Sequence, residues 1–359
     1  DLTLDILLRL YNATLTLGHI PRKWKHAKVV FIPKGKDRDP SDPKSYRPIS
    51  LLNTIGKLLE KVMAKRVDWL LETTGGLSRS QYGFKDLSCC EYAIDNVCNS
   101  AFSAFKSQRE VLGIFLDISA AFDAAWHPSI LESLLRRKFP LYIVHWVSNY
   151  LAGRCVSLTV GSCTVSETLE RSCPQGGCLS PILWNCIVDD ALRLELPECV
   201  TVQAYADDIC VLVKGENRSQ LSDGATSALS TIVEWGKSKK LSFNSQKTEA
   251  ILFSRKRPNP LPVTIGMNGG QLPISSSVRY LGVILDSKLT FRDHINTVCN
   301  KGLALLHSLS SAVKRGWGLS FDSVRLLYTG VVLPTCLYAS YTWVSALEFD
   351  CYVKSFQRV

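Results

Sequence analysis

The chain has 359 residues, of which 46% are hydrophobic and 21% are charged, so its composition excludes a disordered protein and allows two or three packed units. Its net charge of +10 suits a polyanionic partner, although a merely basic globular protein has the same charge. The thirteen cysteines fit neither a disulfide scaffold nor a zinc signature, which indicates reduced thiols in an intracellular protein. No stretch is typical of a signal peptide or a membrane span, and the missing initial Met indicates a fragment or a processed product.

The N-terminal part predicts helices on both sides of a basic segment. Residues 21–48 carry nine lysines and arginines, contain a predicted strand at residues 29–32, and include a Pro- and Gly-rich loop at residues 34–44. Apolar residues recur at helical spacing before and after this segment. Helices are therefore predicted over residues 2–17, 51–71 and 89–106.

The rest of the chain alternates strands with helices before it becomes helical throughout. Strands are predicted over residues 111–117, 156–160, 163–169, 201–205, 209–213, 250–253 and 278–285. Helices are predicted over residues 129–138, 179–194 and 223–239, with a basic, Pro-rich loop at residues 255–262. From Phe291 onward the pattern is helical with a break at residues 316–318, which predicts a small helical subdomain.

Tyr205-Ala206-Asp207-Asp208 is the most informative stretch, because two adjacent carboxylates interrupt an apolar, strand-like sequence. The flanking residues predict a hairpin with Asp207 and Asp208 at its tight connection. Burying two like charges is unfavourable unless a cation offsets them, and hard oxygen ligands suit Mg²⁺. An ordinary Asp-Asp turn explains these four residues equally well, since Asp is common in turns.

A third carboxylate favours the metal site. Asp117 ends an apolar run of strand length, so its carboxylate and the Asp207-Asp208 pair are expected at neighbouring strand ends. Such a site holds two Mg²⁺ ions, which clamp the attacking and leaving oxygens of a phosphoryl transfer. We interpret Asp123 as a capping or surface residue of the helix that begins near Ser119, and not as a ligand.

Several segments, in this order, resemble the sequence blocks of a reverse transcriptase, and in particular those of non-LTR (LINE-type) retrotransposons. The blocks are residues 24–34, 46–52, 81–84, 115–123, 174–181, 205–208, 244–248 and 280–282. One Tyr-x-Asp-Asp recurs by chance, but the ordered set covers nearly the whole chain.

The resemblance implies an α+β fold of the right-hand polymerase type. Residues 1–109 are expected to form mainly fingers, residues 110–289 a palm with an antiparallel sheet and interleaved finger elements, and residues 290–359 a helical thumb. The implied activity is that of an RNA-directed DNA polymerase, a nucleotidyltransferase that adds dNTPs to a DNA primer 3′ end by two-metal phosphoryl transfer, for target-primed retrotransposition.

The resemblance also implies the metal ligands. Asp117, Asp207 and Asp208 would hold two Mg²⁺ ions, for which Mn²⁺ can substitute, and the backbone carbonyl of Ile118 would be a further ligand. Asp117 and Asp207 would do most of the coordination.

Nucleotide contacts follow from the same resemblance. Phe122 would be a steric gate against a 2′-hydroxyl, whereas the sequence alone favours core packing for it. Arg47 would grip the triphosphate, assisted by Lys34 or Lys36. Lys247 would protonate the leaving pyrophosphate, although an ordinary surface lysine is nearly as good an interpretation.

Template and primer contacts are implied for another set. Gln175 would contact the nucleotide or the template, and Gly176 and Gly177 would let the backbone approach a nucleic acid closely; a tight turn alone also explains these glycines. The other residues expected at the template and primer are Tyr205, Tyr280, Leu281 and Gly282.

The implied partners are an RNA template, a DNA primer or nicked target DNA, and dNTPs, with no membrane. Nothing in the chain resembles an endonuclease, so that domain is expected on the flanking chain of the full-length protein. Target-primed synthesis implies the nucleus, with ribonucleoprotein assembly in the cytoplasm. The alternatives are a catalytically silent, domesticated RNA-binding scaffold, an intron-encoded maturase or a telomerase; an RNA-dependent RNA polymerase is disfavoured by Phe122.

Overall fold

A five-stranded sheet forms the centre of the palm in the computed structural model, which describes residues 2–35, 38–256, 263–267, 269–314 and 317–358. The strand order is β11-β8-β3-β7-β6, and all neighbouring pairs are antiparallel except β11 with β8. The strands are β3 (Glu110–Asp117), β6 (Val200–Tyr205), β7 (Asp208–Gly215), β8 (Glu249–Phe253) and β11 (Ile274–Ser275).

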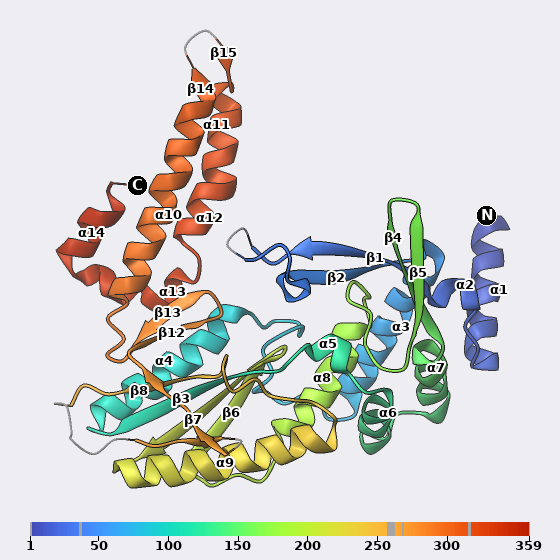
Figure 1. Cartoon of the computed structure of the whole chain (residues 1–359), viewed down its shortest axis with the longest axis horizontal. Coiled ribbons are helices and arrows are strands. Elements are labelled where there is room, and N and C mark those ends of the chain that lie inside the picture. Colours follow the sequence, from blue (N-terminus) through green and yellow to red (C-terminus); the bar gives the residue numbers. More distant parts are fainter. Residues whose placement is uncertain (1, 36–37, 257–262, 268, 315–316, 359) are drawn as a thin grey trace.

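Alternate residues of the central strands face two separate cores. In β7, Val211 packs with helix α9 (Arg218–Ser238) on one face, whereas Cys210 and Leu212 pack with helix α4 (Cys90–Lys106) on the other. Successive side chains of a β-strand point to opposite faces of the sheet, and both faces are covered here. The strand therefore carries apolar residues without a break. The two helices therefore cover opposite faces of the sheet (Figure 1).

A second sheet, with strand order β2-β1-β4-β5, forms the fingers. Its strands are β1 (His26–Pro33), β2 (Tyr46–Leu52), β4 (Arg154–Val160) and β5 (Cys163–Leu169). The parallel β1–β4 pair joins two segments far apart in the sequence. The remaining elements of this half are α1 (Leu2–Leu17), α2 (Arg22–Lys25), η1 (Pro43–Ser45), α3 (Thr54–Thr73), α5 (Ala121–Ala124), α6 (His127–Arg136), α7 (Leu141–Leu151) and α8 (Ser180–Ala191).

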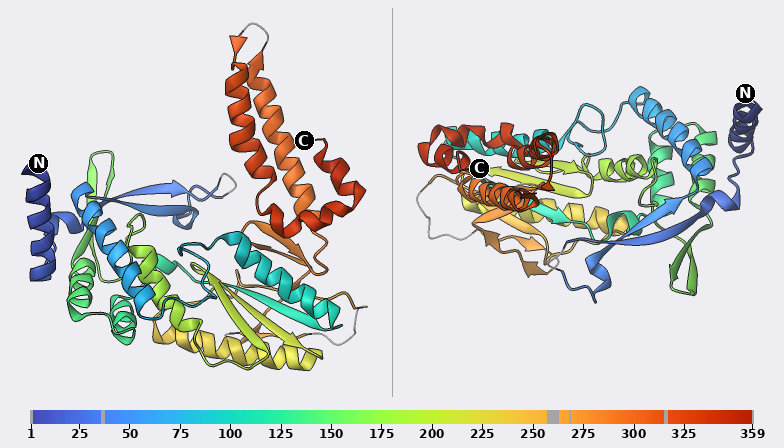
Figure 2. Two further views of the ribbon diagram at one scale, coloured as in Figure 1. Left: turned by 180° about the vertical axis from the view of Figure 1, so that it is seen from behind. Right: turned by 90° about the horizontal axis from the view of Figure 1, so that it is seen from above.

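The C-terminal part rises from the other end of the palm (Figure 1). The hairpin of β12 (Ser277–Tyr280) and β13 (Val283–Asp286) leads into α10 (Arg292–Ala312). The later elements are β14 (Val313–Lys314), β15 (Trp317–Gly318), α11 (Phe321–Leu327), η2 (Tyr328–Val332), α12 (Leu333–Cys336), α13 (Ser340–Trp343), η3 (Val344–Glu348) and α14 (Asp350–Phe356). Both views of Figure 2 place α1 and these helices at opposite ends of the molecule.

The architecture is the right-hand arrangement that the sequence predicts, while the domain boundaries stay predictions. A small hairpin of β9 (Gly266–Met267) and β10 (Gly270–Gln271) packs beside α9. Within the described part of the chain, no single helix is long and apolar enough to span a membrane, and only a pair bent by 48°, residues 321–336 with 340–348, passes that test jointly. All thirteen cysteines are free thiols.

Several element boundaries differ from the sequence prediction. Leu51 and Leu52 belong to β2 and not to the following helix, because the Asn53 side chain accepts from the N–H groups of Ile55 and Gly56 and starts α3 there. The expected helix after Ser119 is the single turn α5. The sequence analysis also missed α7.

One predicted strand is in fact two. The stretch at residues 278–285 folds back on itself at Leu281 and Gly282, whose φ angles are 46° and 90°. A positive φ is expected for Gly but not for Leu, so only Gly282 indicated a turn at this place in the sequence. Parts of the predicted loop at residues 255–262 and of the break at residues 316–318 lie outside the described residues.

A buried carboxylate connects three segments that lie far apart in the sequence. Asp189 on α8 is fully buried and accepts a hydrogen bond from the backbone N–H of Ser78. Its Oδ2 lies 2.6 Å from Arg137 Nη2 and 2.6 Å from Arg193 Nε. One side chain thus joins α6, α8 and the segment before the Gln81 block.

Asp189→Asn is expected to lower the free energy of unfolding by about 3 kcal/mol, because the partly buried Arg137 guanidinium loses one of its two counter-charges and keeps only Asp190. Urea denaturation measures the loss. The control is Asp5→Asn, which breaks the exposed Asp5–Arg9 pair on α1 and should change nothing measurable. An equal effect of both substitutions would contradict the structural role of Asp189.

Candidate active site

The three predicted carboxylates belong to adjoining strand ends on one side of the palm sheet. Asp117 is the last residue of β3 and Asp208 the first of β7, and the two are direct cross-strand partners. Asp208 also pairs with Tyr205 of β6, so Ala206 and Asp207 alone make the connection. Ala206 has a φ of 57°, a left-handed conformation that a non-Gly residue adopts at a penalty of roughly 1–2 kcal/mol. The predicted hairpin is confirmed, and its turn is strained.

Burial and mutual repulsion act on these carboxylates. Burial, followed by the charges of Asp207 and Asp117, raises the pKa of Asp208 to about 6. Burial and the Asp117 charge also raise the pKa of Asp207, against the opposing effects of its own backbone N–H and of the Arg47 charge. The site therefore holds more negative charge than its protein neighbours offset.

A divalent cation fits this donor set, because hard oxygens are the ligands of Mg²⁺ and Mn²⁺. Among the residues that the structure describes, no three His, Cys, Asp or Glu side chains already converge as a finished metal centre. This is compatible with Mg²⁺, which takes one or two carboxylates and fills its other positions with substrate phosphates and water. Ligation by Asp117, Asp207 and Asp208 stays a prediction.

Lys247 reaches the same site from the segment that follows α9. Its Nζ lies 3.5 Å from Asp117 Oδ2, and both side chains are partly exposed. The backbone N–H of Asn244 donates to the carbonyl of Asp117 at 3.0 Å, and the N–H of Lys247 donates to the carbonyl of Asn244 at 3.2 Å. Lys247 is therefore held beside the carboxylates, where a lysine can meet a phosphate.

Ile118 is fixed on both sides by backbone bonds. It forms an isolated antiparallel bridge with Phe243, made by the Asn244-to-Asp117 bond and by a bond of 2.9 Å from the Ser119 N–H to the Ser242 carbonyl. Its side chain is buried. The backbone at Ile118 is thus rigidly placed next to Asp117, as its predicted role requires.

The predicted triphosphate residues lie on the fingers. Arg47 is exposed on β2, opposite Ile32 of β1, and its charge lowers the pKa of Asp207, which places the guanidinium on the side of the carboxylates. Lys34 Nζ donates to the carbonyl of Lys44 at 2.9 Å. The alternative candidate, Lys36, lies outside the described residues.

Gln175 is bonded to Asp123, the residue that the sequence analysis set aside. Gln175 Nε2 donates to both carboxylate oxygens of Asp123 at 3.1 Å. Burial raises the pKa of Asp123, while the bond from Gln175 and the charge of Lys34 oppose that rise. The interpretation of Asp123 as a cap or surface residue is therefore wrong: it is half-buried and orients Gln175. The contact joins residues 52 positions apart, which no local pattern reveals.

Contacts within the protein explain the two glycines that follow Gln175. Gly176 has a φ of 110°, and a Cβ there would lie 3.1 Å from the carbonyl oxygen of Ser50. A Cβ on Gly177 would overlap the carboxylate of Glu60. Because internal contacts already demand Gly at both positions, the predicted approach to a nucleic acid is not needed to explain them.

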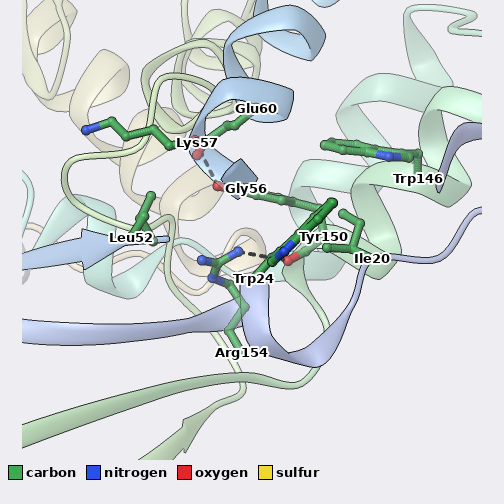
Figure 3. Close-up of a pocket in the computed structure, with 9 residues that line it drawn as sticks. All are labelled: Ile20, Trp24, Leu52, Gly56, Lys57, Glu60, Trp146, Tyr150 and Arg154. Atoms are coloured by element: carbon green, nitrogen blue, oxygen red, sulfur yellow. Dashed lines mark hydrogen bonds between the residues drawn. The ribbon is translucent and has the colours of Figure 1, made fainter. Parts of the chain in front are cut away.

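Glu60 is a buried residue that the sequence analysis missed. Its Oε1 accepts from the backbone N–H of Leu179 at 3.0 Å and from the Tyr150 hydroxyl at 2.9 Å. The guanidinium of Arg154 lies over the Tyr150 ring, 4.7 Å from its centroid, beside a small cavity (Figure 3). Glu60 thereby ties helix α3 of the fingers to the turn that carries Gln175. A charged residue on the apolar face of a predicted helix was the available signal.

Phe122 packs in an aromatic cluster. Its ring centroid is 5.6 Å from that of the buried Trp184 and 6.2 Å from that of Phe84. The Phe122 carbonyl accepts from the N–H of Cys173 at 2.8 Å, which anchors the segment after Asp117 to the Gln175 turn. The ring is half-buried, so core packing and the predicted gate are both compatible with its position.

The predicted primer contacts differ in accessibility. Tyr280 is buried, with its ring 4.7 Å from that of Phe115 and its hydroxyl bonded to Gln203 Nε2 at 3.1 Å. Its ring thus supports the sheet, and the turn at Leu281 and Gly282 is the part that can meet a primer. Tyr205 is half-buried at the end of β6.

Asp208→Asn is expected to raise the free energy of unfolding at pH 7 in EDTA, by less than the whole pKa shift implies, because Asp208 is solvent-exposed and water screens its charge. The native pKa of about 6 exceeds the unfolded value of about 4, so the native state binds more protons between these values and stability falls as pH rises through them. The gain should vanish below about pH 4. Urea denaturation at several pH values measures it, with the exposed Asp223→Asn as control. An unchanged stability at pH 7 would refute the argument.

Comparison with known proteins agrees with this geometry. The profile of the family described as "Reverse transcriptase (RNA-dependent DNA polymerase)" matches residues 32–285. A putative 115 kDa protein of the type-1 retrotransposable element R1DM of Drosophila melanogaster is 31% identical over 95% of this chain and 32% of its own length. The RNA-directed DNA polymerase from mobile element jockey of Drosophila funebris is 31% identical over 94% of this chain and 37% of its own length.

The chain spans about a third of the length of these curated relatives. Among solved structures, an apo telomerase from Candida tropicalis, truncated from its C-terminal domain, has a TM-score of 0.51 and 12% identity, covering 76% of this chain and 55% of that chain. That likeness concerns the fold alone. The family match, the relatives and the palm geometry agree: the chain belongs to the reverse transcriptase family, whose members use divalent metal ions, and its relatives are proteins of non-LTR retrotransposons.

Proposed function

We propose that this chain is the polymerase part of a non-LTR retrotransposon protein and that it extends a DNA 3′ end with dNTPs on an RNA template. The observation that carries the proposal is the pairing of Asp117 with Asp208 beside Asp207, in a partly exposed site where desolvation and the neighbouring like charges raise the pKa of Asp208 to about 6. Binding RNA, itself a polyanion, does not require a cluster of mutually repelling carboxylates.

Asp117, Asp207, Asp208 and the Ile118 carbonyl would hold two Mg²⁺ ions, or Mn²⁺ in their place. When bound, these ions lower the pKa of the primer 3′-hydroxyl and neutralise charge on the triphosphate. The chain itself contributes the orientation of the carboxylates. Lys247, 3.5 Å from Asp117, is placed to hold or donate a proton near the leaving pyrophosphate.

The nucleotide would lie between the fingers and the palm. A cavity of about 730 Å³ on the fingers sheet has Asp123 and Gln175 in its lining, but the lining includes none of the three metal-site carboxylates, so the cavity adjoins the proposed nucleotide position and does not define it. Arg47 and Lys34 would bind the phosphates, and the half-buried Phe122 would lie under the sugar and exclude a 2′-hydroxyl. Gln175, Gly176 and Gly177 would line the path of the template.

The proposed partners are an RNA template and a DNA primer at a nicked target, with an endonuclease on the flanking chain of the full-length protein and synthesis in the nucleus. The thumb helices α10 and α11 and the turn at Leu281 would contact the primer duplex. The net charge of +10 supports a nucleic-acid partner through association with phosphates.

The purified chain with Mg²⁺ should incorporate dNTPs on an RNA template annealed to a DNA primer, and Asp207→Ala should lower the rate by at least about 100-fold, because a metal ligand is lost. Primer-extension gels measure incorporation. Asp223→Ala, on the exposed face of α9, is the matched control and should retain full activity. A folded wild-type chain that binds RNA but incorporates nothing would favour the domesticated scaffold instead.

Asp123→Asn should lower kcat/KM for dNTPs roughly tenfold, because the carboxylate that fixes the Gln175 amide becomes an amide that no longer dictates its orientation. Steady-state primer extension measures the effect, and Asp223→Asn is the control with the same substitution on a surface. Unchanged kinetics in a folded Asp123→Asn variant would show that Gln175 needs no orienting partner.

A further inference from the structure

The segment that contains Gln81 lies directly against the turn that carries Asp207. The N–H of Ala204 donates to the carbonyl of Ser80 at 2.9 Å, and the N–H of Tyr82 donates to the carbonyl of Ala204 at 2.8 Å. These bonds form a parallel bridge between Gln81 and Ala204 on β6. The segment thus extends the edge of the palm sheet at the end where the carboxylates lie.

Gln81 makes the direct contact with the turn. Its side chain is fully buried, and its Oε1 accepts from the N–H of Gly83 at 2.9 Å and from the N–H of Ala206 at 3.3 Å. Only the carbonyl end of the amide can accept from two N–H groups, so the network itself fixes the side-chain orientation. Gln81 therefore binds the residue immediately before Asp207.

The turn needs such support. Ala206 has a left-handed φ of 57°, which is unfavourable for a residue with a Cβ and persists only where its surroundings enforce it. Gly83 packs so closely against Tyr205 and Ala206 that any Cβ there would overlap their backbone. On the other side, Asn185 Nδ2 donates to the carbonyl of Gly83 at 2.8 Å, which ties the support to α8.

Simple core filling does not explain a glutamine here. Among the described residues, no partner is found for Gln81 Nε2, and burying an unpaired amide donor is unfavourable by comparison with an apolar side chain of the same size. The side-chain oxygen, in contrast, accepts two hydrogen bonds, from the N–H groups of Gly83 and Ala206. Local rules are expected to be broken in this way at functional sites.

We propose that Gln81 is a positioning residue for the polymerase reaction: it holds the strained peptide of Ala206 so that Asp207 and Asp208 are presented together at the end of the sheet. It touches neither the substrate nor the reacting atoms and acts only through the turn. The proposal rests on the proposed polymerase function. It assigns to the Gln81-Tyr82-Gly83 block the support of the catalytic turn.

The test compares Gln81→Met, which keeps the side-chain size but removes the acceptor, with Gln81→Glu, which keeps an oxygen at that position. In Gln81→Met we expect kcat to fall on the order of 10- to 100-fold, because small displacements of catalytic groups have effects of that size. KM for dNTPs should change less than about threefold, and the Mg²⁺ concentration for half-maximal rate should rise. Gln81→Glu should recover most of kcat.

The control for a general loss of stability is Ser133→Ala, which removes a buried hydrogen bond to the Cys186 carbonyl between α6 and α8. It should lower the melting temperature but leave kcat and the Mg²⁺ requirement unchanged. Should Gln81→Met fail to fold, Gln81→Asn, whose amide oxygen stops about 1.5 Å short, takes its place. A folded Gln81 variant without the acceptor that keeps the wild-type kcat and Mg²⁺ requirement would overturn the proposal.

A double-mutant cycle adds a readout that does not depend on activity. If the Gln81 bond holds Ala206 in its left-handed conformation, Ala206→Gly should relieve part of the stability loss of Gln81→Met, so the two effects are not additive. Strictly additive effects would contradict the proposal. An inactive wild-type chain, by contrast, would refute the proposed function and leave the coupling between Gln81 and Ala206 intact.

Discussion

The mutual repulsion of Asp117, Asp207 and Asp208 is the constraint on which the rest of the palm depends. β-Sheet pairing fixes the Cα atoms of Asp117 and Asp208 opposite each other, so the charges cannot separate without breaking the sheet. The protein offsets part of this repulsion with the Lys247 ammonium and the Arg47 charge. A divalent cation can neutralise the remaining negative charge, so the arrangement lowers stability in favour of cation binding.

Two carboxylates outside the metal site, Glu60 and Asp123, hold the neighbouring Gln175 segment in place. Glu60 fixes the turn before α8 by accepting from the N–H of Leu179, and Asp123 orients Gln175 by accepting from its side-chain amide. Both are carboxylates with defined partners, so they stay ordered where the metal-site carboxylates repel. Gly177 is required because the Glu60 carboxylate lies so close, and Gly176 because of its positive φ and the nearby carbonyl oxygen of Ser50. The residue types of the Gln175 block are thus explained largely by packing inside the protein.

Sequence reasoning succeeded where the signal is local. The helix at residues 2–17, the strands at residues 156–160 and 163–169 and the hairpin at Asp207 all follow from the spacing of apolar residues and from turn residues, and the structure confirms them. It failed where the determinant is a distant partner. The Gln175–Asp123 and Leu179–Glu60 bonds span 52 and 119 positions, and although Glu60 is a charged residue on the apolar face of a helix, no local pattern identifies the partner of either carboxylate. The turn at Leu281 failed for another reason, since a Leu with positive φ is imposed by its surroundings.

Those surroundings include the thumb. The Tyr338 hydroxyl donates to the carbonyl of Leu281 at 2.8 Å and lies 3.1 Å from Cys90 Sγ, while a Cβ on Gly282 would lie 3.0 Å from the Tyr338 ring. One thumb residue therefore contacts both the turn where primer contacts are predicted and the start of the palm helix α4. Because the Leu281 carbonyl is held by that hydroxyl, the thumb can move relative to the palm only by breaking this bond or by carrying the turn with it. If the turn contacts a primer as proposed, the bond from Tyr338 to Leu281 links the position of the primer end to that of the thumb.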